Sequence, residues 1–439
     1  MTSDRPWTGP LRAAYEDAAE WPVQRERVER LARLYLANGF DAEAGALLPG
    51  IIARRPDAPE WVHRRAVLLA GEGRLQEAVA LWQSIRSKTN AYLPVRVKLA
   101  DALVKLNRET EAVQIYRELL VAQPGYPYAW YGLVSLDLQH QDWVAAREKL
   151  QSALAAAPDF YGHYALLESV ARHFGDEAGA AEADRHVKRL GRFRDVPDPW
   201  VEPAVADCYD PYRLRVDADR LRSEAEVIGG DTGLAGALER IERAITLAPR
   251  DAMNYQFLAT IQGIRGDDGA AARAFDQCLE LEPRGVTAYL RYNNLLIRQG
   301  KREAARALLA RGATHCPEDT DIAAALGDAC AAAGAWPEAA EAYLRLVALR
   351  PDLPDIAPKA AMASFRAGAV ETGLKVLREN LRRYPHHEQT LGYLLMDAVR
   401  RGDAQEARDL VQRLEAVAPA SPATKEMQRL VWARFGEAR

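Results

Sequence analysis

The 34 residues from Ala252 to Gly285 read AMNYQFLATIQGIRGDDGAAARAFDQCLELEPRG. Apolar residues recur at helical spacing in two runs, one around Tyr255 and one around Phe275, and each run predicts a helix with a single apolar face. Gly266 lies between the runs and can end the first helix in a left-handed conformation, while Pro283 ends the second. The stretch therefore predicts a helix, a tight turn and a second helix.

The same pattern returns along the chain at a fixed interval of 34 residues. The terminal proline of the pattern recurs as Pro249, Pro283, Pro317, Pro351, Pro385 and Pro419. A small residue recurs where the two helices should approach most closely, as Ala237, Ala271, Ala305, Ala339, Gly373 and Ala407. Because two short helices cannot bury their apolar faces alone, successive units must stack and share a continuous core.

A helix-turn-helix unit of this length, with a small residue near its middle and a proline at its end, resembles the tetratricopeptide repeat. The resemblance implies an all-α fold, an α-solenoid or superhelix of about eleven helix-turn-helix repeats. It also implies that the first helices of successive repeats line a concave face, where members of this family bind an extended peptide or a partner helix.

The phase of the repeat divides the chain into five segments. A weakly patterned leader spans residues 1–24, five repeats span 25–194 with the last one degenerate, and an insertion spans 195–217. Six further repeats span 218–421, and residues 422–439 predict a capping helix with Met427, Leu430, Val431 and Phe435 on its apolar face. The insertion is rich in proline and aromatic residues, so we expect an ordered, mostly extended connection that packs against the repeats.

The overall composition narrows the class of partner. The chain has 58 basic and 62 acidic residues and a net charge of -4, which argues against a nucleic-acid partner. Its four cysteines form no CxxC pair and have no zinc-like spacing. The N-terminal residues lack the pattern of a signal peptide, and no apolar stretch is long enough for a membrane span. We therefore expect a cytoplasmic protein.

Two local motifs resemble cofactor or metal sites. Cys316 and Pro317 resemble a haem-responsive motif, but Pro317 is already explained as the end of a repeat. His386 and His387 are adjacent in a turn and lack a third ligand at suitable spacing. No nucleophile has a matched base and orienting acid. We expect no cofactor, no bound metal and no catalytic residue.

Candidate partner-binding residues follow from the resemblance, which assigns the exposed positions of the first helices to the concave face. They are Tyr128, Tyr131, Ser135, His173, Met253, Gln256, Thr260, Leu290, Asn294 and Asp328. The corresponding positions of two earlier repeats hold His63 and Val97. Tyrosine gives a large contact area at low entropic cost, and asparagine can pair with a peptide backbone. The positions that match the cations of a carboxylate clamp hold no lysine or arginine, so we do not expect such a clamp.

These observations predict a non-catalytic scaffold that binds a protein or peptide partner of unknown identity, with its oligomeric state open. Two alternatives remain. The chain could be an accessory subunit or assembly chaperone of an enzyme or redox complex, or a regulatory protein that responds to a small ligand.

Overall fold

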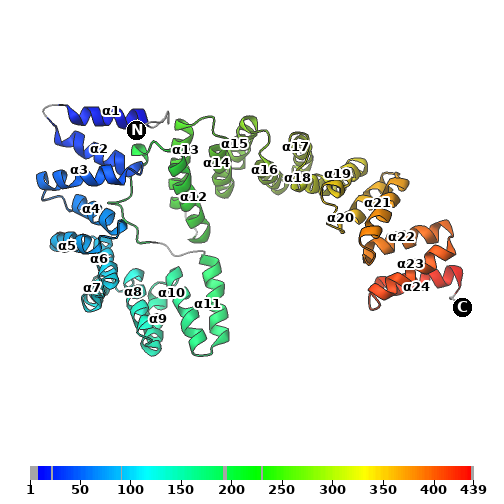
Figure 1. Cartoon of the computed structure of the whole chain (residues 1–439), viewed down its shortest axis with the longest axis horizontal. Coiled ribbons are helices and arrows are strands. Elements are labelled where there is room, and N and C mark those ends of the chain that lie inside the picture. The colour runs from blue at the N-terminus through cyan, green and yellow to red at the C-terminus, as the bar shows by residue number, and fades with distance from the viewer. Residues whose placement is uncertain (1–7, 21–22, 90, 191–194, 229–230, 437–439) are drawn as a thin grey trace. The chain divides into compact units, whose positions relative to one another are not determined.

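A computed structural model describes residues 8–20, 23–89, 91–190, 195–228 and 231–436 (Figure 1). The predicted boundary at Arg194, and parts of the predicted leader and capping helix, lie outside these residues. Within them the protein has twenty-four α-helices, two short 3-10 helices and no strand, so the predicted all-α fold is confirmed. The chain forms two units, Met1–Ile261 and Gln262–Arg439.

Unit 1 begins with α1 (Thr8–Ala19), and five helix pairs follow. The pairs are α2 (Arg25–Ala37) with α3 (Asp41–Arg54), α4 (Pro59–Gly71) with α5 (Leu75–Ile85), α6 (Leu93–Lys105) with α7 (Glu109–Ala122), α8 (Pro127–Gln139) with α9 (Trp143–Ala156), and α10 (Tyr161–His173) with α11 (Glu177–Leu190). The 3-10 helix η1 (Arg86–Lys88) follows α5, and η2 (Val205–Asp207) precedes α12 (Pro211–Ile228) and α13 (Asp231–Leu247). The last helix that begins in unit 1, α14 (Ala252–Arg265), crosses into unit 2.

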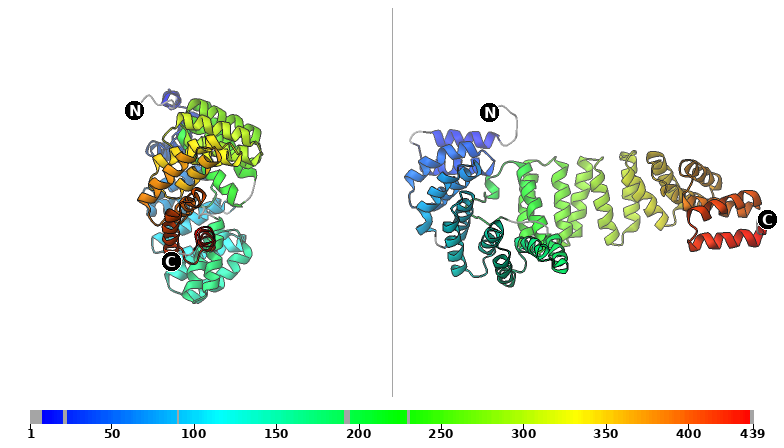
Figure 2. Two further views of the ribbon diagram at one scale, coloured as in Figure 1. Left: turned by 90° about the vertical axis from the view of Figure 1, so that its right-hand side faces the viewer. Right: turned by 60° about the horizontal axis from the view of Figure 1, so that its bottom comes forward.

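Unit 2 continues the alternation of first and second helices. It contains α15 (Asp268–Leu281), α16 (Val286–Arg298) with α17 (Arg302–His315), α18 (Thr320–Ala332) with α19 (Trp336–Leu349), α20 (Ile356–Arg366) with α21 (Val370–Arg383), α22 (Glu388–Arg401) with α23 (Ala404–Val417), and α24 (Pro422–Phe435). Consecutive helices from α16 to α24 pack side by side (Figure 2). From α2–α3 to α22–α23 the described helices make eleven successive pairs, as the repeat pattern predicts.

The turn inside most pairs is closed by a residue with positive φ. Glycine takes this conformation at Gly39, Gly73, Gly175, Gly266, Gly300, Gly334, Gly368 and Gly402. Two pairs depart from the pattern, because Asn107 between α6 and α7 and Gln141 between α8 and α9 adopt the same left-handed conformation. A residue with a Cβ atom is strained there, so these two turns cost more than the glycine turns.

The small residue of each repeat lies at the contact between its two helices. Alanine is completely buried there, at Ala44, Ala78, Ala112, Ala146, Ala237, Ala271, Ala305, Ala339 and Ala407. A Cβ atom at Gly373 would lie only 2.5 Å from the ring of Phe365, which explains why glycine replaces alanine in that repeat.

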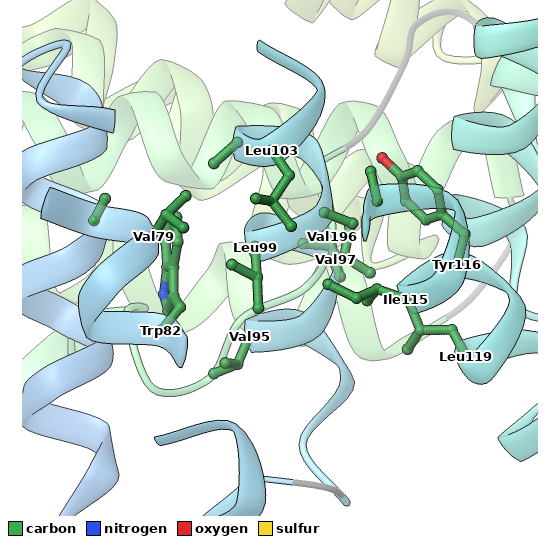
Figure 3. Close-up of a cluster of buried hydrophobic side chains, with 14 of the residues drawn as sticks. Val79, Trp82, Val95, Val97, Leu99, Leu103, Ile115, Tyr116, Leu119 and Val196 are labelled. Carbon is green, nitrogen blue, oxygen red and sulfur yellow. The ribbon is translucent and has the colours of Figure 1, made fainter. Parts of the chain in front are cut away.

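The largest apolar cluster of unit 1 lies around α5, α6 and α7 (Figure 3). Trp82, Leu99 and Tyr116 belong to it, and Val196 from the insertion is buried in the same cluster. The last helix of unit 2, α24, covers the final pair by packing Val431 against α23. Leu430 was predicted on the same apolar face but is 45% exposed, so the buried stripe of α24 is narrower than its sequence suggests.

Candidate functional site

The first helices of unit 1 hold a non-helical stretch of the same chain. Residues 195–200, here called the internal segment, contain no helix. They contact His63 of α4, Lys98 of α6 and Tyr128 of α8. The insertion thus lies along positions that the sequence pattern assigned to the concave face. The boundary between the two units falls within α14 and not at this insertion.

A buried carboxylate anchors the internal segment. Asp198 is 5% exposed, and its two oxygens accept hydrogen bonds from His63 Nε2 at 2.8 Å and from the Tyr92 hydroxyl at 2.7 Å. The indole Nε1 of Trp82 donates to His63 Nδ1 at 2.8 Å. Because an indole N–H can only donate, Nδ1 must be the acceptor, and the ring proton of neutral His63 is on Nε2. Trp82 therefore fixes the tautomer that binds the carboxylate.

The charge state of this group follows from its surroundings. Burial raises the pKa of Asp198, but the hydrogen bonds from His63 and Tyr92 lower it by more, so the pKa lies below its usual range. Burial, together with the hydrogen bond to Asp198, raises the pKa of Tyr92, so its hydroxyl keeps its proton. At neutral pH the site therefore holds an ionised carboxylate that accepts hydrogen bonds from His63 and Tyr92.

An aromatic stack holds the end of the internal segment. The ring of Trp200 lies parallel to that of Tyr92, with their centroids 3.8 Å apart. The rings of His63 and Trp200 pack edge to face, with their centroids 6.0 Å apart. The backbone N–H of Trp200 also donates to the Tyr92 hydroxyl at 2.9 Å. Tyr92 therefore contacts the segment through its ring face, its hydroxyl proton and a hydroxyl lone pair.

Two further contacts hold the backbone of the insertion. The Tyr128 hydroxyl donates to the carbonyl oxygen of Asp195 at 2.9 Å. Beyond the internal segment, the side chain of Asn38 donates to the carbonyl of Asp207 at 2.9 Å and accepts from the N–H of Tyr209 at 2.7 Å. Asn38 follows α2, and the sequence analysis missed it because it lies in a turn and not on a first helix.

His63 and Val97 were mapped to exposed positions of the concave face, and the structure corrects this. His63 is fully buried, and Val97 is 2% exposed. Both lie beneath or beside the internal segment, which covers this part of the face. Repeat periodicity assigns a residue to a helix face but does not reveal what lies against that face.

Two of the predicted binding residues meet at one aromatic ring. Tyr128 and Tyr131 both approach Phe160 edge-on, with centroid distances of 5.0 and 6.2 Å. Tyr128 and Phe160 line an open cleft of about 1160 Å³ together with Tyr161, the internal segment and parts of α12 and α13. The sequence analysis did not single out Phe160, because it precedes α10 and is not on a first helix.

The remaining predicted residues of unit 1 are dispersed. Ser135 on α8 is half-buried. His173, at the end of α10, is exposed and stacks on Trp143 with centroids 4.0 Å apart. On α14, Met253 is 44% exposed, and the Thr260 hydroxyl donates to the carbonyl of Gln256 at 2.9 Å.

In unit 2, the predicted residues lie on two first helices that contact each other, α16 and α18. Leu290 is half-buried, and Asn294 is exposed. Asp328 accepts hydrogen bonds from the Tyr343 hydroxyl at 2.6 Å and from Lys359 Nζ at 3.2 Å, yet 59% of its side chain remains exposed. Lys359 also lies over the ring of Tyr343, 5.8 Å from its centroid.

No group of three or more His, Cys, Asp or Glu side chains among the described residues is arranged to hold a metal ion. Among the helices described, none has the length and apolar character needed to cross a membrane.

Family models described as tetratricopeptide repeat match residues 69–133, in α4 to α8, and residues 294–354, in α16 to α19 with the turn that follows. Among curated proteins, none matches this chain.

Several solved structures are similar at low identity. One is the MamA protein, at 16% identity and a TM-score of 0.31, covering 39% of this chain and 90% of that one. Another is YrrB, described as a TPR protein with an unusual peptide-binding site, at 18% identity and a TM-score of 0.31, covering 42% and 91%. Yeast Tom70 has 14% identity and a TM-score of 0.30, covering 93% and 95%.

Proposed function

Since the chain belongs to the tetratricopeptide-repeat family, we propose that it is a scaffold without catalytic activity that binds an extended segment of a protein partner along the first helices of its repeats. One observation carries this proposal. The first helices of unit 1 hold residues 195–200 of the same chain, a non-helical stretch that ends in a turn, with hydrogen bonds to both backbone and side chains. Such a surface has the chemistry needed to bind a peptide.

The contacts divide into two kinds. Tyr128 and Tyr92 bind the backbone at Asp195 and Trp200, and contacts of this kind accept many sequences. His63 and Tyr92 bind the carboxylate of Asp198, which selects for one side chain. Affinity from the backbone combined with specificity from side-chain pockets is a common way to recognise an extended peptide.

For the partner, we propose the first helices of unit 2, with Leu290, Asn294 and Asp328 as contact residues. In the described part of unit 2 the helices are joined by short turns, the longest being Arg350–Asp355, so no connection there is long enough to lie along several helices. Met396 on α22 is 52% exposed and offers an adaptable apolar surface. The exposed pair of Asp328 and Lys359 contributes little to stability, and a partner's charged group can replace either member.

We also propose that the scaffold acts in the cytoplasm. Its four cysteines are unpaired, and three of them are buried. Free buried thiols suit a reducing compartment, where disulfides are rare.

Affinity capture from the native lysate tests the binding face. The bait proteins are the intact chain, a Leu290→Ala/Asn294→Ala variant, and Arg302→Ala on α17 as a control on an exposed second helix. We expect a partner that the intact chain and the control retain and the double variant loses. Synthetic segments of that partner, titrated by calorimetry, should then identify an extended stretch that binds alone. A partner that survives the double variant would refute the assignment of the face.

A further inference from the structure

The internal segment alternates strictly between buried and exposed residues. Val196 and Asp198 are each 5% exposed, and Trp200 is half-buried, whereas Asp195, Pro197 and Pro199 are exposed. From Asp195 to Asp198 this period of two is that of an extended strand, in which every second side chain points to the same side. A turn follows, closed by the N–H of Val201 donating to the carbonyl of Asp198 at 2.9 Å, and it places Trp200 against the repeats as well. Three consecutive inward positions therefore enter the repeats, and each meets a different kind of site.

The first inward position enters an apolar site. Val196 belongs to the cluster around α5, α6 and α7, beside Val97 of α6 (Figure 3). This site accepts a side chain by burial alone and makes no hydrogen bond, so it selects for an apolar residue of moderate size.

The second inward position meets a pair of donors that the repeats themselves hold in place. The bond between Trp82 and His63 lies wholly within α4 and α5, where the two side chains are 2% and 0% exposed. It directs His63 Nε2–H at the position of the carboxylate whichever chain supplies that carboxylate. A donor pair prepared in this way favours an acidic residue and disfavours an amide, which brings its own N–H group to one of the two donors.

The third inward position is an aromatic slot. The ring of Tyr92 supplies one face, and His63 supplies an edge. The ring of Trp200 remains half-buried, so the slot is open at one side and admits a large flat ring. The outward prolines restrict the backbone, Pro197 in the extended part and Pro199 in the turn that follows, and so lower the entropy lost on binding.

We propose that the first-helix face of α4, α6 and α8 recognises a protein segment of the pattern apolar-x-Asp-x-aromatic, and that residues 195–200 occupy this site until a partner segment of that pattern displaces them. This inference rests on the proposed function and adds a second binding face, in unit 1, with a ligand chemistry of its own. The internal segment is a competitor tethered to its own site, and tethering by a short linker corresponds to an effective concentration of about millimolar. A free peptide must therefore bind weakly to the intact chain and more tightly when the internal segment is weakened.

The test uses a fluorescent peptide with the sequence of residues 195–202, DVPDPWVE, and fluorescence anisotropy. It is titrated with the full-length chain, with an Asp198→Ala/Trp200→Ala variant, and with a milder Trp200→Ala variant in case the double variant fails to fold. Circular dichroism must give native helix content for each protein used. We expect the weakened variants to bind the peptide at least about tenfold more tightly than the intact chain.

Control peptides distinguish specific recognition from nonspecific binding. A peptide with Asn at the second acidic position, DVPNPWVE, and one with Ala in place of Trp, DVPDPAVE, should each bind at least about tenfold more weakly, since each loses one of the two specific contacts. Absence of saturable binding to a folded variant, or equal binding of the Asn peptide, would overturn the proposal. Capture of a partner through Leu290 and Asn294 does not depend on this result, so the inference can fail while the proposed function stands.

Discussion

Replacing Asp198 with Asn tests the buried network with almost no change in shape. The amide offers a single acceptor oxygen to two donors, and its NH2 group must face one of them. His63 cannot reverse its tautomer, because Trp82 donates to its Nδ1 atom. The NH2 group must then point at the Tyr92 hydroxyl, which already accepts from the N–H of Trp200.

The size of the destabilisation by Asp198→Asn can be estimated from these contacts. A hydrogen bond to a charged group contributes about 1.5–3 kcal/mol, and Asp198→Asn removes the charge from two such bonds and the acceptor from one. We therefore expect the local opening of the internal segment to become easier by about 2–3 kcal/mol, which corresponds to exchange about 30- to 150-fold faster.

Hydrogen–deuterium exchange measures this opening directly. The amides of the six non-proline residues from Val196 to Ala204 should exchange faster in Asp198→Asn than in the wild-type chain. Glu77→Gln, which breaks an exposed ion pair with Arg74 in the nearby α5, should leave their exchange unchanged. An acceleration below about threefold in Asp198→Asn would show that the network does not hold the segment.

The same network predicts a pH dependence. The folded pKa of Asp198 is below its usual value, so its ionised form stabilises the segment above the unfolded pKa of about 3.9. This contribution is lost as the pH falls through that value towards the folded pKa. The difference in exchange between the wild-type chain and Asp198→Asn should therefore be largest near neutral pH and shrink below about pH 4.

Three further substitutions test the fold. Ala271→Leu adds a large side chain at a fully buried helix contact and should destabilise by about 1–3 kcal/mol, seen as a lower melting temperature; an unchanged melting temperature would argue against close packing there. Gln141→Gly relieves a left-handed backbone and should stabilise by up to about 1 kcal/mol, whereas a lower urea midpoint would contradict that strain. Asn38→Ala leaves the carbonyl of Asp207 and the N–H of Tyr209 without their partner and should cost about 1–3 kcal/mol, measured by amide exchange at these residues; exchange as slow as in the wild type would contradict it.

The repeat architecture was predictable because it is local. A proline every 34 residues, a small residue between the helices and a glycine turn each act within one unit, and together they specify eleven pairs. The sequence predicts the turn inside a repeat less clearly where the repeat has no glycine between its helices. Asn107 and Gln141 lack the glycine of the other turns, and only their spacing of 34 and 68 residues from Gly73 indicates a left-handed turn there.

The path of the insertion over the repeats was harder to predict from the sequence. Its prolines and aromatic residues indicated an ordered, extended stretch, but not the surface on which it lies. The bond between His63 and Asp198 joins positions 135 residues apart, and periodicity carries no information over that distance. Consequently, His63 and Val97 were mapped to an exposed face, and neither Asn38 nor Phe160 was singled out.

The long-range bond from His63 to Asp198 also changes how the two units should lose their structure. In a linear array each repeat contacts only its neighbours, so melting can start at one end and progress repeat by repeat. Unit 2 is such an array and should fray from α24 inwards. In unit 1 the internal segment ties α4, α6 and α8 together and its continuation ties in α2, so none of the four repeats that begin with these helices can melt without releasing the others. These four repeats should therefore unfold as one cooperative block.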